Sequence, residues 1–181
     1  MSDPATEFAA TARLIDGRVV AVRSLRAEDA EAVMALHQHL SDHDRYFRFF
    51  TLRPAPLQEL VGNLTEQAGG LCALGAFDAD RLIGVAHYVL VQDDPKAAEF
   101  AIVVAHEDHS LGVGTALLKQ LGRVARARGI ERFVADVLGE NHLMLMVVFD
   151  LGWRCAPADY APVRHLEIEL PDFVEEAPEV S

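Results

Sequence analysis

The chain has 181 residues, 51% of them hydrophobic, which suits one globular domain with a sizeable core. Its net charge is −12, from 16 lysines and arginines against 28 aspartates and glutamates, and this balance argues against nucleic acid as a partner. No apolar run approaches the roughly 18 residues of a membrane-spanning helix, and no signal-peptide pattern opens the chain. We therefore expect a cytoplasmic protein with no membrane partner.

The first half of the chain alternates between apolar runs and turn residues. Residues 1–12 show no periodicity, and we expect them to form a flexible lead-in. An Asp16-Gly17 turn introduces the first strand, and Ser24 opens the first helix. The predicted elements that follow the lead-in are a strand at 19–23, helices at 24–40 and 56–67, and strands at 71–77, 81–91 and 97–105.

The second half is organised around the stretch from Glu99 to Arg128. An apolar strand runs through a polar turn and Gly112 into an amphipathic helix, which ends at Gly129. The elements predicted after it are a strand at 132–138, a helix at 141–150, strands at 153–157 and 163–170, and an acidic, disordered tail at 171–181. This order indicates an α/β fold with one parallel crossover, between the strands at 97–105 and 132–138.

The segment 109–115, which we call the glycine loop, predicts a binding site for a phosphate group. A strand that feeds a glycine turn and a helix N-terminus directs unpaired backbone N–H groups and the positive end of the helix dipole at one point. Two nucleotide motifs fail on spacing. A dinucleotide fingerprint needs glycine at Leu117, and a GxxxxGK phosphate loop needs lysine at Thr115.

Several runs resemble a known family. VAHEDHSLGVGTALL resembles the acyl-coenzyme-A-binding motif of the GNAT N-acetyltransferases, Q/R-x-x-G-x-G/A, and GENHLMLMVVFDLGW resembles their Asn-led penultimate helix. LSDHDRYFRFF and AEFAIVV resemble the acetyltransferase domain of bacterial Pat-type protein lysine acetyltransferases. The resemblance implies a GNAT domain at 13–170, with a central, mixed, mostly antiparallel sheet of about seven strands flanked by helices.

The resemblance also implies which residues bind acetyl-coenzyme A (acetyl-CoA). Val103 and Val104 would pair with the pantetheine arm as an added strand would, and Asn141 would contact the cofactor from the next crossover. The residues implied for the pyrophosphate, through backbone N–H groups, are His109, Ser110, Leu111, Gly112, Val113, Gly114 and Thr115.

The glycine loop departs from the family pattern. The family has Gln or Arg at His109, Gly at Ser110 and commonly Arg at Leu111, so this loop has lost its cationic side chain. We expect weaker affinity for the phosphates, or a contact from Lys119 or Arg123 instead.

Acetyl transfer to an amine needs a base for the ammonium proton, donors for the oxyanion and an acid for the thiolate. Glu99 is the expected base, because burial in an apolar strand would make its carboxylate more basic, and the resemblance to Pat-type enzymes favours it too. The tyrosine that serves as acid in many GNAT enzymes is replaced by Val148, which leaves solvent, Tyr46 or Tyr160.

Other candidate groups are fewer. His87 and Asp136 could line the acceptor side, with Asp136 orienting a cationic acceptor. We expect no metal, because an HExxH motif that starts at His106 would need its second histidine at Ser110.

The favoured function is transfer of an acetyl group from acetyl-CoA to an amine, with a protein lysine as the expected acceptor. A small-molecule amine acetyltransferase stays open, as does a non-catalytic acyl-CoA-binding module that kept the fold. A second copy of the chain, giving a homodimer, is a further possible partner.

Overall fold

Seven strands form one sheet in the computed structural model, which describes residues 8–40, 56–67, 70–138, 141–154 and 162–173. The strands follow one another across the sheet in chain order, and every neighbouring pair is antiparallel except β5 with β6. The strands are β1 (Ala9–Arg13), β2 (Val19–Ser24), β3 (Leu71–Asp78), β4 (Arg81–Val91), β5 (Asp94–Val104), β6 (Arg132–Leu138) and β7 (Val163–Glu169). The predicted mixed, mostly antiparallel sheet of about seven strands is confirmed.

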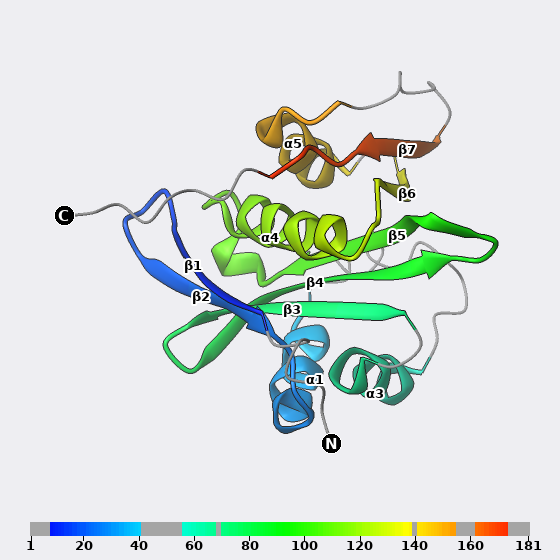
Figure 1. Ribbon diagram of the computed structural model, residues 1–181. Helices are drawn as coiled ribbons and strands as arrows, with labels where there is room; N and C mark the ends of the chain where they lie inside the picture. The colour runs from blue at the N-terminus through cyan, green and yellow to red at the C-terminus, as the bar shows by residue number, and fades with distance from the viewer. Residues whose placement is uncertain (1–7, 41–55, 68–69, 139–140, 155–161, 174–181) are drawn as a thin grey trace, which may run out of the picture.

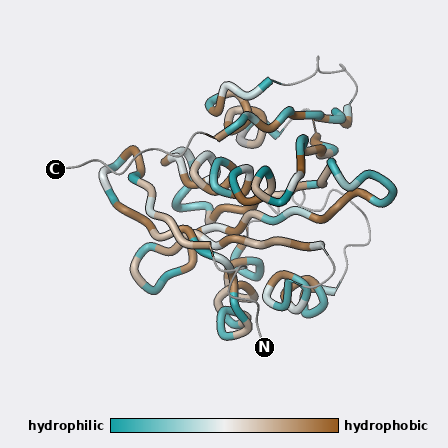
Figure 2. The backbone as a smooth tube through the Cα atoms, in the orientation of Figure 1, coloured by the Kyte–Doolittle hydropathy of each residue, from teal (hydrophilic) through white to brown (hydrophobic). Residues whose placement is uncertain are grey.

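Helices cover both faces of this sheet (Figure 1). On one face lie α4 (Val113–Ala127) and α5 (His142–Leu151), and on the other lie α1 (Ala30–Gln38) and α3 (Leu57–Glu66). The strand interiors are hydrophobic where they pass between the helices, and the turns are hydrophilic (Figure 2). We call the two surfaces of the sheet the α4 face and the α1 face.

Helix α4 owes its position to its apolar stripe. Val113, Leu117, Leu118 and Leu121 are almost fully buried, at helical spacing, against the α4 face of β3, β4 and β5. The helix ends as predicted, because Gly129 adopts a left-handed φ of 87° just beyond its last turn. It is also the crossover that makes β5 and β6 parallel, as predicted.

Two predictions at the chain ends need correction. Residues 9–13 form β1, which the sequence placed mostly in the lead-in, because this segment pairs along its whole length with β2. Of the strand predicted at 153–157, Trp153 and Arg154 belong to no strand, and the remainder lies outside the described residues. The sheet therefore gains strand β1 at its start.

The tail expected to be disordered from residue 171 begins with ordered contacts. Phe173 packs edge-on against Trp153, with ring centroids 5.9 Å apart, and Asp172 forms an ion pair with Arg126. Gly122 of α4 leaves room for this packing, since a Cβ there would lie 2.6 Å from the Trp153 ring. The rest of the predicted tail, and residues 1–7 of the lead-in, lie outside the described residues.

Candidate active site

Strands β5 and β6 stay together for three residue pairs and then separate. The pairs are Ala97 with Arg132, Ala98 with Phe133, and Glu99 with Val134. Beyond this point, which we call the fork, β5 keeps its pairing with β4 and β6 keeps its pairing with β7. One edge of β5 therefore offers backbone groups that no strand of the described sheet uses.

The gap beyond the fork contains a cavity of about 260 Å³. Its lining is mostly apolar and comes from both separated strands, the start of α4, one side of α5 and the turn between β1 and β2. The lining residues are Ile15, Phe100, Ala101, Ile102, Val103, Val104, Asp108, His109, Ser110, Gly112, Val113, Gly114, Thr115, Ala135, Asp136, Val137, Asn141, Met144, Met146, Val147 and Asp150.

The glycine loop and the first turn of α4 form the end of the cavity away from the fork. Ser110 has a φ of 63° and Gly112 one of 94°, so two left-handed residues turn the chain into the helix. No side chain of the described residues caps α4, whose N-cap is Gly112. The first N–H groups of the helix therefore face the cavity mouth without a side-chain acceptor, which is an arrangement that binds anions.

Nearly all residues predicted to bind the cofactor lie around this cavity. Leu111 is the exception, because its side chain packs against the main core and its carbonyl accepts a hydrogen bond from the Ile15 backbone N–H at 3.0 Å. The His109 ring lies 2.9 Å, through Nε2, from the carbonyl oxygen of Val104. The Asn141 side chain caps α5 by accepting a hydrogen bond from the Met144 backbone N–H.

Glu99 lies at the fork, but the burial that we expected for it is wrong. Its side chain is exposed, and it does not line the cavity. Strand alternation explains both facts: Phe100 points to the α4 face and into the core, so Glu99 points to the α1 face. At this position β6 is at its last residue paired with β5, and none of the described strands covers the carboxylate.

The α1 face near the fork gathers the other candidate acceptor groups. Ala101 lies two residues beyond Glu99, and Asp136 lies two residues beyond the Val134 that pairs with Glu99, so both face the same side of the sheet as Glu99. Their partners across the sheet, His87 of β4 and His165 of β7, face that side too. The Nδ1 atom of His165 lies 2.8 Å from the Asp136 carboxylate, and Asp136 lines the cavity. Asp136 was singled out from the sequence; His165 was missed, because only strand pairing brings it there.

A family model described as the acetyltransferase (GNAT) family matches residues 23–145, well over half of the chain. The chain belongs to the GNAT acetyltransferase family. This membership confirms the resemblance to GNAT enzymes seen in the sequence, and with it acyl-CoA-dependent acetyl transfer as the family activity.

Individual GNAT proteins resemble the chain over most of its length. The acetyltransferase PA5475 of Pseudomonas aeruginosa is 30% identical over 159 residues, covering 84% of this chain and 85% of the relative. The GNAT domain of PAT from S. lividans has a TM-score of 0.80 and 29% identity, covering 94% of this chain and 100% of that chain. YncA from Salmonella typhimurium, solved with its cofactor acetyl-CoA, has a TM-score of 0.66 and 15% identity, covering 90% and 99%.

The tyrosine position of other GNAT enzymes is a core position in this domain. Val148 is 8% exposed and belongs to the main core. Tyr88 is buried, its hydroxyl accepts a hydrogen bond from Arg128, and burial raises its pKa to about 12. Tyr46 and Tyr160, the tyrosines considered from the sequence, lie outside the described residues.

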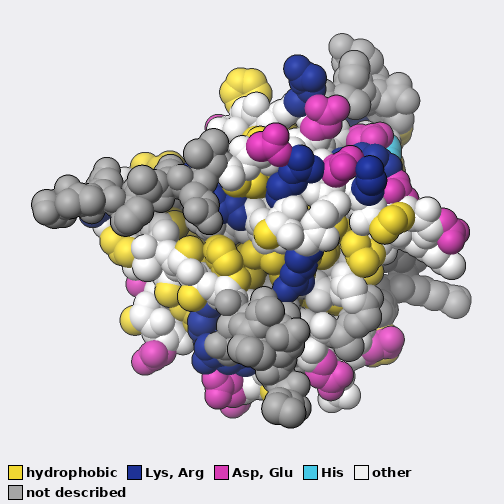
Figure 3. Space-filling view, in the orientation of Figure 1, with side chains coloured by type: hydrophobic (Ala, Val, Ile, Leu, Met, Phe, Trp, Pro, Cys, Tyr) yellow, Lys and Arg dark blue, Asp and Glu magenta, His cyan; other side chains and the backbone are white. Residues whose placement is uncertain are grey.

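Neither basic residue expected to replace the missing cation of the loop lines the cavity. Lys119 is exposed on α4, and the Arg123 guanidinium lies 5.7 Å from the centre of the Phe173 ring. Acidic and basic side chains are interspersed on the face that Figure 3 shows. Among the described residues that line the cavity there is no lysine or arginine, so the groups there that could hold a phosphate are backbone N–H groups and the α4 dipole.

Within the described part of the chain, no group of three or more His, Cys, Asp and Glu side chains could hold a metal ion. In the same residues, no helix has the length and apolar character needed to cross a membrane.

Proposed function

We propose that this GNAT domain transfers the acetyl group of acetyl-CoA to the side-chain amine of a protein lysine. The observation that carries the proposal is the fork between β5 and β6, with Glu99 at its closed end and the N-terminus of α4 at its open end. These two features would supply a proton acceptor beside the closed end of one apolar gap and an anion-binding group of backbone N–H donors at its open end.

The donor substrate fits the gap by its chemistry. The glycine loop and the first turn of α4 would bind the pyrophosphate through backbone N–H groups. The edge of β5 beyond the fork, at Val103 and Val104, would pair with the amides of the pantetheine arm as an added strand would, beside the His109 ring that already contacts the Val104 carbonyl oxygen at 2.9 Å. The apolar lining then keeps water from the thioester, which would lie near Phe100 and Ala101 at the fork.

Glu99 would act from the α1 face, where the acceptor amine would enter. It takes a proton from the ammonium, directly or through a water, and the neutral amine attacks the thioester carbon. A C–N bond forms, the attacking nitrogen loses its second proton to solvent, the C–S bond breaks, and the leaving thiolate takes a proton from solvent. The exposed position of Glu99 suits this role, because a bulky acceptor needs open access to the base.

Two observations favour a cationic acceptor on a protein. Asp136 adds a second carboxylate to the α1 face beside the fork, and such a pair of acids attracts a lysine ammonium. The S. lividans PAT GNAT domain, at a TM-score of 0.80 and 29% identity, supports an acceptor of the Pat type.

An acceptor panel tests the proposal. The purified protein is given acetyl-CoA with lysine-containing proteins, with the same proteins after reductive methylation of their lysines, or with polyamines, amino acids and aminoglycosides. We expect free thiol release and acetyl-lysine, detected by mass spectrometry, only with unmodified protein lysines.

Turnover confined to the free amines would replace the protein acceptor by a small molecule. Thiol release at the background rate with every acceptor, together with tight acetyl-CoA binding, would favour a non-catalytic binding module. The loop without a cationic side chain makes this second outcome worth testing.

A further inference from the structure

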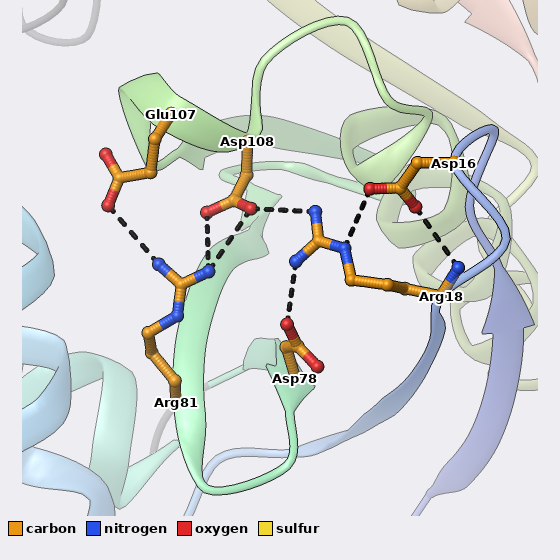
Figure 4. Close-up of polar contacts among 6 residues, drawn as sticks. All are labelled: Asp16, Arg18, Asp78, Arg81, Glu107 and Asp108. Atoms are coloured by element: carbon orange, nitrogen blue, oxygen red, sulfur yellow. Dashed lines mark hydrogen bonds and ion pairs between the residues drawn. The ribbon is translucent and has the colours of Figure 1, made fainter.

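Asp108 is a buried carboxylate placed directly before the glycine loop. It ends the short 3₁₀ helix η3 (His106–Asp108), is 2% exposed, and lines the cavity. Its carboxylate lies between two guanidinium groups, 3.1 Å from Arg18 and 3.2 Å from Arg81 (Figure 4). We call these three residues the loop brace.

The two arginines of the loop brace come from hairpins far away in the sequence. Arg18 follows the turn between β1 and β2, and Arg81 begins β4. Arg18 also binds Asp16 at 2.8 Å and Asp78, the last residue of β3, at 2.7 Å. The hydrogen bonds that the Arg18 guanidinium donates to the carboxylates of Asp16, Asp78 and Asp108, of which the bond to Asp16 has the largest effect, raise the pKa of Arg18 and keep it charged.

The β1–β2 turn holds the glycine loop at a second point. The Ile15 backbone N–H donates to the carbonyl oxygen of Leu111 at 3.0 Å, and the Ile15 side chain lines the cavity. The loop is thus held at its start through Arg18 and Asp108, and in its middle through Ile15 and Leu111. Both contacts come from one hairpin turn.

The glycine loop needs such support because of its own conformation. Left-handed backbone at Ser110 costs free energy that the surroundings must offset, and among the described residues no side chain caps the helix that follows. The loop also contains no lysine or arginine. Affinity for a phosphate therefore depends on how well the backbone N–H groups are held in place before binding.

We infer that Asp108 is a positioning residue for the pyrophosphate of acetyl-CoA, acting through the loop brace on the glycine loop. This inference rests on the proposed function, because it assigns the anion at the loop to the donor substrate. Asp108 forms no bond to the anion in this arrangement. As a carboxylate it would repel the anion, so its contribution comes from holding the loop.

Repulsion and positioning predict opposite signs for one substitution. In Asp108→Asn the negative charge beside the phosphates is lost, and charge alone would then tighten acetyl-CoA binding. Loss of the ion pairs to Arg18 and Arg81 instead loosens the loop. We expect the KM for acetyl-CoA and the Kd for CoA to rise about tenfold, with kcat within about twofold of wild type, because the fork lies at the other end of the cavity.

Glu107→Gln is the matched control. It removes the same charge one residue away, from a side chain that is 68% exposed and forms an ion pair with Arg81. We expect its KM for acetyl-CoA to stay within about twofold of wild type. An unchanged or lower KM in Asp108→Asn, or an equal rise in both variants, would overturn the inference.

Arg18→Lys decides the question if Asp108→Asn fails to fold. Lysine keeps the charge, but its single ammonium group cannot bind Asp16, Asp78 and Asp108 together as the planar guanidinium does. We expect the KM for acetyl-CoA to rise about fivefold at constant kcat. A KM equal to that of wild type would refute the inference.

Calorimetric titration of the wild-type protein with CoA separates this inference from the proposed function. Failure of the wild-type protein to bind CoA refutes the proposed function and this inference with it. Equally tight binding of CoA by wild type, Asp108→Asn and Arg18→Lys refutes the role of the loop brace and leaves the proposed function standing.

Discussion

Glu99 of β5 pairs with Val134 of β6, and this is the last pair before the two strands separate. The residue after Glu99 lines the cavity, whereas Glu99 itself faces the opposite side of the sheet and is exposed. In the proposed reaction, a carboxylate on the acceptor side is thus separated from the donor side only by the strand that carries it. Direct transfer between two substrates needs this relationship, because each must approach the reacting atoms from its own side.

Glu99→Gln tests the proposed base. The amide keeps the shape of the side chain but accepts no proton, so we expect kcat to fall by about 10² to 10⁴-fold. The Kd for CoA should stay close to that of wild type, since Glu99 does not line the cavity. Steady-state thiol release and calorimetry measure the two quantities.

Glu167→Gln is the control for that substitution. Glu167 lies in the same row across the sheet, opposite Val134, but its carboxylate forms an ion pair with Arg132. We expect its kcat within about twofold of wild type. Unchanged turnover in Glu99→Gln would remove Glu99 from the mechanism.

Gly112→Ala tests the backbone conformation of the glycine loop. A Cβ at a φ of 94° is strained, so we expect a loss of about 1–2 kcal/mol in the free energy of unfolding and a higher Kd for CoA. Gly62→Ala is the control, because Gly62 lies within α3 and a Cβ there meets nothing within 4 Å. That change should stabilise the fold by about 0.5–1 kcal/mol. Urea unfolding that ranks the two variants the other way would contradict this account.

One pair of substitutions can separate the capping role of Asn141 from the role in CoA binding that we propose for it. Its side-chain oxygen caps α5, and its position at the cavity suggests a contact with CoA. Asn141→Asp keeps a capping oxygen but loses the amide donor and adds a negative charge near the phosphates. We expect Asn141→Asp to keep the Tm and raise the KM for acetyl-CoA, and Asn141→Ala to lose about 1 kcal/mol of stability as well. If the KM of Asn141→Asp for acetyl-CoA equals that of wild type, Asn141 acts only as the N-cap of α5.

Asp29 links stability to pH. It is 6% exposed and both its oxygens bind Arg23, at 2.8 and 2.9 Å. The Arg23 guanidinium holds the pKa of Asp29 below its ordinary value, and burial opposes this only in part. A lowered pKa contributes stability above the unfolded pKa of about 4, and this stability is lost as the pH falls through the folded value.

Asp29→Asn should therefore cost about 2 kcal/mol at pH 7. The difference from wild type should shrink as the pH falls below about 4. Urea unfolding across the acid range measures this, with Asp80→Asn in the exposed β3–β4 turn as the control. If the difference in the free energy of unfolding stays constant down to pH 2, the Asp29–Arg23 ion pair does not cause the loss of stability in acid.

The parts of the fold that could be predicted from the sequence are those that local residue patterns encode. Helix α4 and strand β6 lie within a residue or two of their predicted bounds, because glycines and a periodic apolar stripe mark them locally. Strand β1 was missed, since Ala9–Arg13 has little strand propensity and becomes a strand by pairing with β2. The turn of the β1–β2 hairpin, which this strand helps to form, also contacts the glycine loop through Ile15.

The candidate site divides in the same way. The sequence by itself determined the glycine turn into α4 and predicted that it binds an anion, because backbone conformation at Gly112 and the start of α4 depends on neighbouring residues. Only the tertiary structure decided that Glu99 is exposed at the fork and that Asp108 meets Arg18 and Arg81. Strand separation and ion pairs join segments distant in the chain, and no local pattern contains those distances.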